Sequence, residues 1–305
     1  MTSQESAVTP DGVATDSVIH DIGFRHYDGP RLGRGWAFRS LFYETLRGSF
    51  GLGRPAKVKI MPWVLIVLFA LPSLVMVAIT ILTASEELPL SYTMYPVAIS
   101  LVVSLFIAGR APYAVSRDLR DGIMPLYLSR PIRRQDYVYA KLLGLSAAVW
   151  IFVATPVTIL FIGALLAKFS VKDAIFGWLG GLLMAAVLSI LLTSISLVLA
   201  SFTKRKGLGV AAVLSTLILL NGFVAVLVSV VDMQSSETAA SYFAVLDPYM
   251  LVDGLGAAWL GVDTTFLYSQ PDGALGAVYY SAVLLVVVTG CVAILLRRFK
   301  KVGGV

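Results

Sequence analysis

The chain has 305 residues, of which 58% are hydrophobic and 14% are charged, with a mean hydropathy of +0.84 and a formal net charge of +6. Soluble domains carry about 25% charged residues, so this composition excludes a soluble enzyme, a disordered chain and a secreted disulfide-rich scaffold. The single cysteine, Cys291, has no second cysteine with which to form an intrachain disulfide.

The first 59 residues contain no long apolar run. We expect residues 1–22 to form a disordered cytoplasmic tail, because they are rich in Ser, Thr and acidic residues. Residues 23–59 form a predicted cytoplasmic segment in which aromatic residues alternate with arginines, a pattern typical of an amphipathic helix at a membrane surface. A simple anchor and a contact with a cytoplasmic partner both fit this interfacial helix, whose predicted residues include Trp36, Arg39, Tyr43, Leu46 and Arg47.

Six apolar blocks follow, and each is long enough to cross a hydrocarbon core of about 30 Å as an α-helix. The predicted spans are 60–83, 94–115, 142–167, 174–202, 208–231 and 274–296. None of these blocks shows the period-two alternation of a transmembrane strand. The sequence therefore predicts an all-α integral membrane protein with a single six-helix transmembrane domain over residues 60–305.

The basic residues predict the orientation of these spans. Of the 24 Lys and Arg, 22 precede the first span or lie around the connections between spans two and three, between spans four and five, and after span six. Only Lys168 and Lys172 fall on the other side. The positive-inside rule therefore predicts that both termini are cytoplasmic. The positive net charge is explained by topology, and no nucleic-acid partner is expected.

The connection between spans two and three, residues 116–141, has an apolar centre between charged flanks. A loop that only returned the chain to the membrane would not need such a centre. We expect a short cytoplasmic helix that inserts its apolar face into a groove of a partner, while the flanking charges set orientation and association rate. A solvated loop with an excess of positive charge is the alternative.

The connection between spans five and six, residues 232–273, contains no Lys or Arg. Within it, residues 248–262 are apolar but too short to span a membrane, and Asp253 and several glycines interrupt them. This pattern suggests re-entrant or interfacial helices on the extracellular side. Such helices could gate the outer end of a pathway or shield the ends of the spans.

The spans lack the residues on which several reaction classes depend. Both histidines lie in the N-terminal segment, no phosphate-binding loop occurs, and no catalytic or metal site is predicted. Arg110, near the cytoplasmic end of span two, is the only charged residue within the six blocks, so a transporter driven by an ion gradient is disfavoured. Neutral polar residues either line a pathway or form interhelical hydrogen bonds; the candidates are Asn221, Thr155, Thr158, Thr193 and Ser194.

The segment between spans two and three resembles the ABC-2 type permease family. The residues that carry the resemblance are Asp118, Arg120 and Asp121, then Leu126-Tyr127-Leu128, Ser129-Arg130-Pro131, Arg133-Arg134, Tyr137-Val138 and Lys141. The likeness extends in outline over the N-terminal amphipathic helix, the six spans and the long external connection. One departure is Gly122-Ile123-Met124-Pro125, where the family often has Gly-Thr before its leucines. Pro125 would shorten or bend a helix there.

The resemblance implies a permease subunit of a bacterial inner-membrane exporter for a hydrophobic or amphiphilic substrate. It implies two separate ABC ATPase subunits, which carry the ATP and Mg, and a second permease copy or paralogue. It also implies a coupling helix whose site residues are Asp118, Arg120, Asp121, Leu126, Tyr127, Arg130 and Pro131. The alternatives are a non-transporting membrane scaffold that recruits a soluble partner through residues 116–141, and a secondary transporter.

Overall fold

The apolar blocks of the sequence fold into helices in the computed structural model. The structure describes residue 29 and residues 32–85, 87–123, 126–127, 132–203, 205–234, 237–265 and 273–302, and no β-strand occurs among them. Residues Gly33–Val305 form one compact unit, to which all of the following refers. The predicted disordered tail, residues 1–22, lies outside the described residues.

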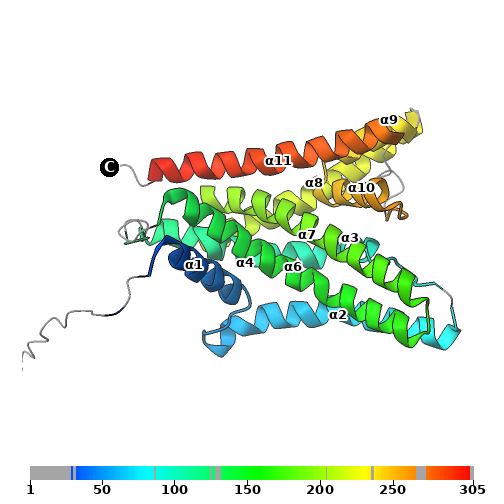
Figure 1. Cartoon of the computed structure of the whole chain (residues 1–305). Coiled ribbons are helices and arrows are strands. Elements are labelled where there is room, and N and C mark those ends of the chain that lie inside the picture. The colour runs from blue at the N-terminus through cyan, green and yellow to red at the C-terminus, as the bar shows by residue number, and fades with distance from the viewer. Residues whose placement is uncertain are drawn as a thin grey trace, which may run out of the picture. The chain divides into compact units, whose positions relative to one another are not determined.

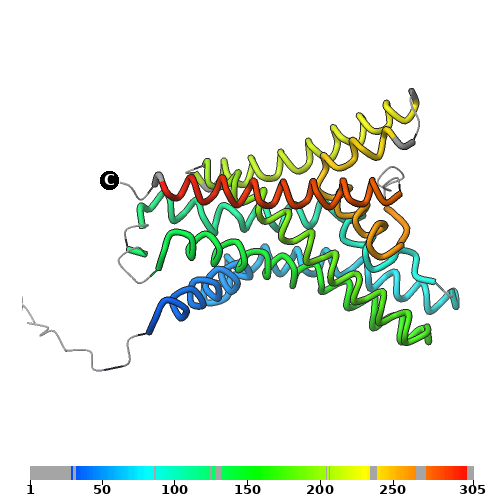
Figure 2. Tube along the Cα trace, turned by 45° about the horizontal axis from the view of Figure 1, so that its top comes forward, coloured from blue at the N-terminus to red at the C-terminus, as the bar shows by residue number. Residues whose placement is uncertain are grey.

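The helices of this unit run mostly alongside one another (Figures 1 and 2). Their bounds are α1 (Arg34–Ser49), α2 (Ala56–Thr83), α3 (Met94–Ala98), α4 (Ser100–Arg120), α6 (Arg134–Leu166), α7 (Val171–Phe202), α8 (Lys206–Gln234), α9 (Glu237–Ala244), α10 (Pro248–Leu260) and α11 (Gly273–Val302).

Five helices, α2, α6, α7, α8 and α11, are long and apolar enough to cross a membrane. Large apolar side chains stand exposed along α2, α8 and α11, for example Val67, Leu219 and Val286. Such extended apolar surface is not stable in water, whereas lipid covers it at no cost. The predicted all-helical membrane fold is therefore confirmed in outline.

The predicted second span, 94–115, differs from a single helix. The chain turns at Ile99 between α3 and α4, and α4 then continues to Arg120. Charged residues lower the hydropathy of α4, so it does not count among the five apolar helices. Packing explains how it tolerates these charges, because α4 contacts α6, α7 and α8 and most of its side chains from Val102 to Asp118 are buried. A helix enclosed by other helices does not need an apolar surface for lipid.

Aromatic rings join three of these helices at the centre of the bundle. Phe106 of α4 stacks on Phe152 of α6 with ring centroids 4.2 Å apart, and Phe152 stacks on Phe69 of α2 at 4.9 Å. Tyr95 of α3 packs on Phe69 and donates a hydrogen bond from its hydroxyl to the Phe69 carbonyl. Buried aromatic pairs add stabilisation beyond the area that they bury, so this column fixes α2, α4 and α6 together.

Helix α1 packs closely against α6 at Gly144. Leu41 and Thr45 of α1 are buried, and Gly144 of α6 lies against Phe42 and Thr45. A Cβ atom at Gly144 would lie 2.8 Å from the Phe42 carbonyl oxygen and 2.9 Å from the Thr45 Cβ. The absence of a side chain at Gly144 therefore allows the two helices to approach this closely.

The segment after α8 folds back along that helix. Asp247 caps α10 by accepting a hydrogen bond from the Met250 backbone amide, and its carboxylate also accepts from the Asn221 side chain at 3.0 Å. Asn221 lies 13 residues before the end of α8, or about 20 Å at 1.5 Å per residue. The α9–α10 pair thus reaches well below the end of α8, in the region where the sequence predicted re-entrant or interfacial helices.

The Gly144→Val variant should lose stability, because overpacking at a tight contact costs about 1–3 kcal/mol. The matched control is Gly222→Val in α8, where no atom lies within 4 Å of the added Cβ. Thermal unfolding of both variants in the same detergent measures the difference. Equal melting temperatures for the two variants would show that the α1–α6 contact does not need Gly144.

Candidate functional site

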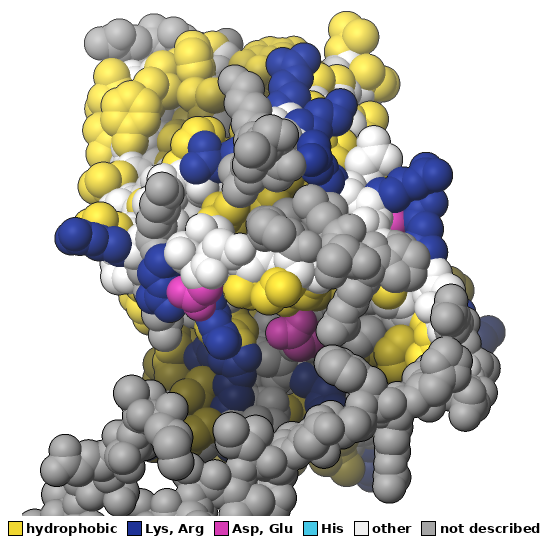
Figure 3. Space-filling model, turned by 90° about the vertical axis from the view of Figure 1, so that its left-hand side faces the viewer, with side chains coloured by type: hydrophobic (Ala, Val, Ile, Leu, Met, Phe, Trp, Pro, Cys, Tyr) yellow, Lys and Arg dark blue, Asp and Glu magenta, His cyan; other side chains and the backbone are white. Residues whose placement is uncertain are grey.

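One end of the bundle gathers the basic residues. Helix α1, the end of α4, the start of α6 and the end of α11 lie together there, at the left of Figure 1. Figure 3 faces this end and shows Lys and Arg side chains spread across it. Helices α3, α9 and α10 lie at the opposite end. The predicted coupling residues that the structure describes, Asp118, Arg120, Asp121, Leu126 and Tyr127, belong to the basic end, which makes it the candidate site.

A buried cluster, which we call the Asp118 clasp, consists of Asp118, Tyr137 and Lys141. The Lys141 Nζ atom lies 3.0 Å from Asp118 Oδ2, and both side chains are less than a tenth exposed. The Tyr137 hydroxyl donates a hydrogen bond of 2.8 Å to the same oxygen. The clasp therefore joins the last turn of α4 to the first turns of α6, which are the two ends of the predicted coupling segment.

A second ion pair fixes α1 to the start of α6. The Arg34 guanidinium donates two hydrogen bonds to Asp136, of 2.6 Å to Oδ2 and 2.5 Å to Oδ1. Asp136 also accepts a hydrogen bond from the Arg133 backbone amide at the N-terminus of α6. This bidentate arrangement holds α1 in one orientation.

Contacts to backbone carbonyls tie the remaining helix ends together. Ser116 of α4 donates to the Ala200 carbonyl of α7, and Arg298 of α11 donates to the Ser201 carbonyl at 2.7 Å. Arg134 of α6 donates to the Lys300 carbonyl of α11. Positive side chains at the C-terminal ends of helices also interact favourably with the helix dipole. The basic end is therefore a connected framework.

The exposed part of the site consists of Arg120, Asp121 and Leu126. Arg120 Nε lies 2.8 Å from Asp121 Oδ1 in an ion pair at the surface, and this hydrogen bond lowers the pKa of the Asp121 carboxyl below its usual value. Leu126 is 68% exposed, whereas Tyr127 is partly buried with its ring 5.6 Å from that of Tyr137. An exposed leucine beside a charged pair suits a partner surface.

The predicted coupling residues are thus separated by burial. Asp118 faces the interior, and Arg120, Asp121 and Leu126 face outward. Arg130 and Pro131 lie outside the described residues. The extent of a coupling helix therefore stays a prediction, and its described parts are the end of α4 and the helical residues Leu126–Tyr127.

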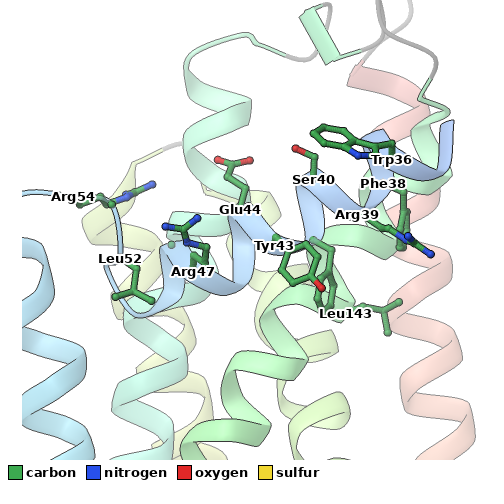
Figure 4. Close-up of a pocket in the computed structure, with 13 residues that line it drawn as sticks. Trp36, Phe38, Arg39, Ser40, Tyr43, Glu44, Arg47, Leu52, Arg54 and Leu143 are labelled. Carbon is green, nitrogen blue, oxygen red and sulfur yellow. The ribbon is translucent and has the colours of Figure 1, made fainter. Parts of the chain in front are cut away.

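The predicted interfacial residues lie on α1, and all of them except Leu46 line an open groove of about 1090 Å³ (Figure 4). Trp36 and Tyr43 are more than half exposed. Arg39 and Arg47 are exposed along the same helix, and Leu46 is partly buried. This side of α1 presents aromatic rings and guanidinium groups together, a combination typical of membrane interfaces.

Among the described residues, no hydrogen bond joins two of the five candidate pathway residues. Thr155 and Ser194 donate to backbone carbonyls of their own helices. The Thr158 hydroxyl donates to a carbonyl of its own helix and accepts from the Trp178 indole, and Asn221 donates to Asp247. Thr193 is fully buried, and its hydroxyl has no partner among the described residues. Two of the five therefore link elements, and a role in a pathway stays a prediction.

Sequence reasoning missed the pairing of these residues. Asp118 and Lys141 both belonged to the quoted motif, but no pattern indicated that they meet. Arg34 and Asp136 are 102 positions apart. The one available signal was Lys141, which directly precedes the apolar block 142–167. A charged residue at the start of such a helix needs a partner if it is not exposed.

Among the described residues, no group of three or more His, Cys, Asp or Glu could hold a metal ion. The described site offers ion pairs, an exposed apolar side chain and firm attachment to the helices.

Residues 70–303 match the family model described as ABC-2 family transporter protein. No curated protein matches the chain. The matched range begins within α2, includes the whole segment between α4 and α6, and covers all of α11.

Replacing one member of the clasp should destabilise the protein strongly. Asp118→Asn leaves the Lys141 ammonium buried without a charge partner, and breaking such a pair costs about 3–5 kcal/mol. Lys141→Met should have a similar cost, and the Asp118→Asn/Lys141→Met double variant should recover most of it. A double-mutant cycle by unfolding in detergent measures the coupling.

The control for this cycle is Asp121→Asn, which removes an exposed carboxylate three residues away. It should change the free energy of unfolding by less than about 1 kcal/mol. Additive losses in the clasp double variant, or losses no larger than that of the control, would contradict the assignment.

Proposed function

Because this chain belongs to the ABC-2 family of transporter proteins, we propose that it is the permease subunit of an ABC transporter driven by a separate ATPase that docks on the basic end. The sequence contains no phosphate-binding loop of its own. In this proposal ATP and Mg bind to the partner ATPase. The chain itself carries no cofactor and contributes the membrane path.

The proposal assigns six membrane spans to α2, α4, α6, α7, α8 and α11. Helix α4 is the central span, because its polar residues are enclosed by its neighbours. An even number of spans brings both termini to the same side of the membrane. The Lys and Arg side chains at that end support a cytoplasmic placement of the termini in a bacterial inner membrane, with α1 as an interfacial elbow.

The observation that carries the proposal is that the segment between α4 and α6 is anchored by buried contacts and also presents exposed charged and apolar residues. The Asp118 clasp joins α4 and α6 at the two ends of the connecting segment. Outside the clasp, the side chains of Arg120, Asp121 and Leu126 are exposed at the surface. A movement of a docked ATPase would therefore pass through a short, firmly attached segment into two helices of the bundle.

Two ATPase subunits and a second permease copy or paralogue complete the proposed assembly. Alternating access between the two permeases would export a hydrophobic or amphiphilic substrate, since the described spans offer mainly apolar surface. The α9–α10 pair lies at the opposite end, against α7, α8 and α11. In the proposal it closes the outer end of the path.

If the ATPase docks on the basic end, the Arg120→Ala/Asp121→Ala variant should lose binding of the ATPase and keep its fold. When a purified ABC ATPase from the same genome is titrated onto the chain in mild detergent, we expect the variant to bind it at least tenfold more weakly than the native chain does, a difference of about 1.4 kcal/mol. The melting temperature of the isolated chain should not change, because both side chains are exposed.

The matched control is Lys172→Ala/Asp173→Ala, a neighbouring pair of opposite charges that is exposed at the other end of the bundle. It should retain the ATPase. If both variants retain it equally, or if the native chain binds no ATPase in mild detergent, the proposal fails. If the native chain does bind the ATPase, ATP-dependent efflux from reconstituted vesicles distinguishes a transporter from a non-transporting scaffold, which would show none.

A further inference from the structure

Arg110 of α4 is a buried cation without an anionic partner. It is 5% exposed, and its Nη2 atom donates to the Met61 sulfur at 3.2 Å. Its Nε atom has no hydrogen-bond partner among the described residues. A thioether is a weak acceptor, and a buried charge that is not paired is strongly unfavourable. The position of Arg110 therefore calls for an anion.

A second arginine increases this need. Arg54, in the turn between α1 and α2, lies with its guanidinium 3.9 Å from the centre of the Tyr113 ring. Tyr113 lies three residues after Arg110 in α4, so Arg54 approaches the same face of this helix as Arg110. Burial and the positive charge of Arg117 lower the pKa of Arg54. Glu44 attracts Arg54, but no ion pair between them occurs among the described residues.

The surroundings indicate the kind of anion. Arg54 lines the open groove along α1, which also contains Arg47 and Tyr43 (Figure 4). The first turns of α2, which follow Arg54 in the chain, expose the apolar side chains of Ile60 and Val64. A group of positive charges thus adjoins a surface suited to hydrocarbon. An anion that carries acyl chains satisfies both features, whereas a free anion satisfies only the first.

We propose that Arg54 and Arg110 form a binding site for the phosphate group of an anionic phospholipid whose acyl chains lie along the exposed face of α2. Guanidinium groups bind phosphate oxygens through paired hydrogen bonds. The phosphate would offset the repulsion between the two arginines and supply the missing acceptor at Arg110. The site would also fix the turn between α1 and α2 at the membrane surface.

This inference rests on the membrane placement of α2 and α4 and not on the ATPase partner. Lipid binding and ATPase docking therefore succeed or fail separately.

The test is native mass spectrometry of the full chain in detergent, titrated with phosphatidylglycerol or with phosphatidylcholine of the same acyl chains. The native chain should bind phosphatidylglycerol at least tenfold more tightly. Arg54→Gln and Arg110→Met should each abolish this preference. Arg205→Gln, which removes an exposed arginine from the same end of the bundle, should leave it unchanged.

Equal affinity for the two lipids, or an unchanged preference in Arg54→Gln, would overturn the proposal. Arg54 is partly exposed, so its variant remains informative if Arg110→Met does not fold. Inorganic phosphate is the remaining arm of the experiment. If it displaces phosphatidylglycerol at concentrations similar to those of the lipid, the site is one for free anions and the lipid assignment is wrong.

Discussion

The buried ion pair between Asp118 and Lys141 determines how the basic end of this protein is built. Two charges removed from water are favourable only when they are close, well oriented and joined by further hydrogen bonds. Tyr137 supplies one such bond, and its ring packs against Phe299 of α11. The need to satisfy one carboxylate therefore brings α4, α6 and α11 together. The exposed residues between α4 and α6 take their position from that junction.

The same requirement explains the place of α4 within the bundle. A helix that carries Arg110 and Asp118 cannot face lipid along its length, so the apolar helices surround it. Asp118 forms an ion pair with Lys141, whereas the Nε atom of Arg110 has no hydrogen-bond partner among the described residues. The first supports coupling to a partner in the proposed function. The second underlies the proposed lipid site.

The helices themselves could be predicted because long apolar blocks have few alternatives in a membrane. Their ends were less predictable. Helix α6 begins at Arg134, two turns before the expected span, since Asp136 and Lys141 find partners in α1 and α4. The predicted span 94–115 divides at Ile99 for reasons of packing that no local pattern carries. Arg110, predicted at the cytoplasmic end of the second span, is enclosed by its neighbours, and the sequence did not indicate this burial. The motif includes both Asp118 and Asp121 as charged residues, so the sequence could not predict that only Asp118 is buried.

The most direct measurement of the central claim uses single cysteines. In a Cys291→Ser background, Arg117→Cys and Asp263→Cys place one thiol at each end of the bundle, both at exposed positions. Arg117 lies one turn before the proposed docking residues and is not one of them. We predict that a membrane-impermeant maleimide labels position 117 only from the cytoplasmic side, and that the bound ATPase blocks this labelling. Position 263 should be labelled only from outside, with or without the ATPase. Labelling of position 117 from outside, or labelling of position 117 that the ATPase does not change, would contradict the account.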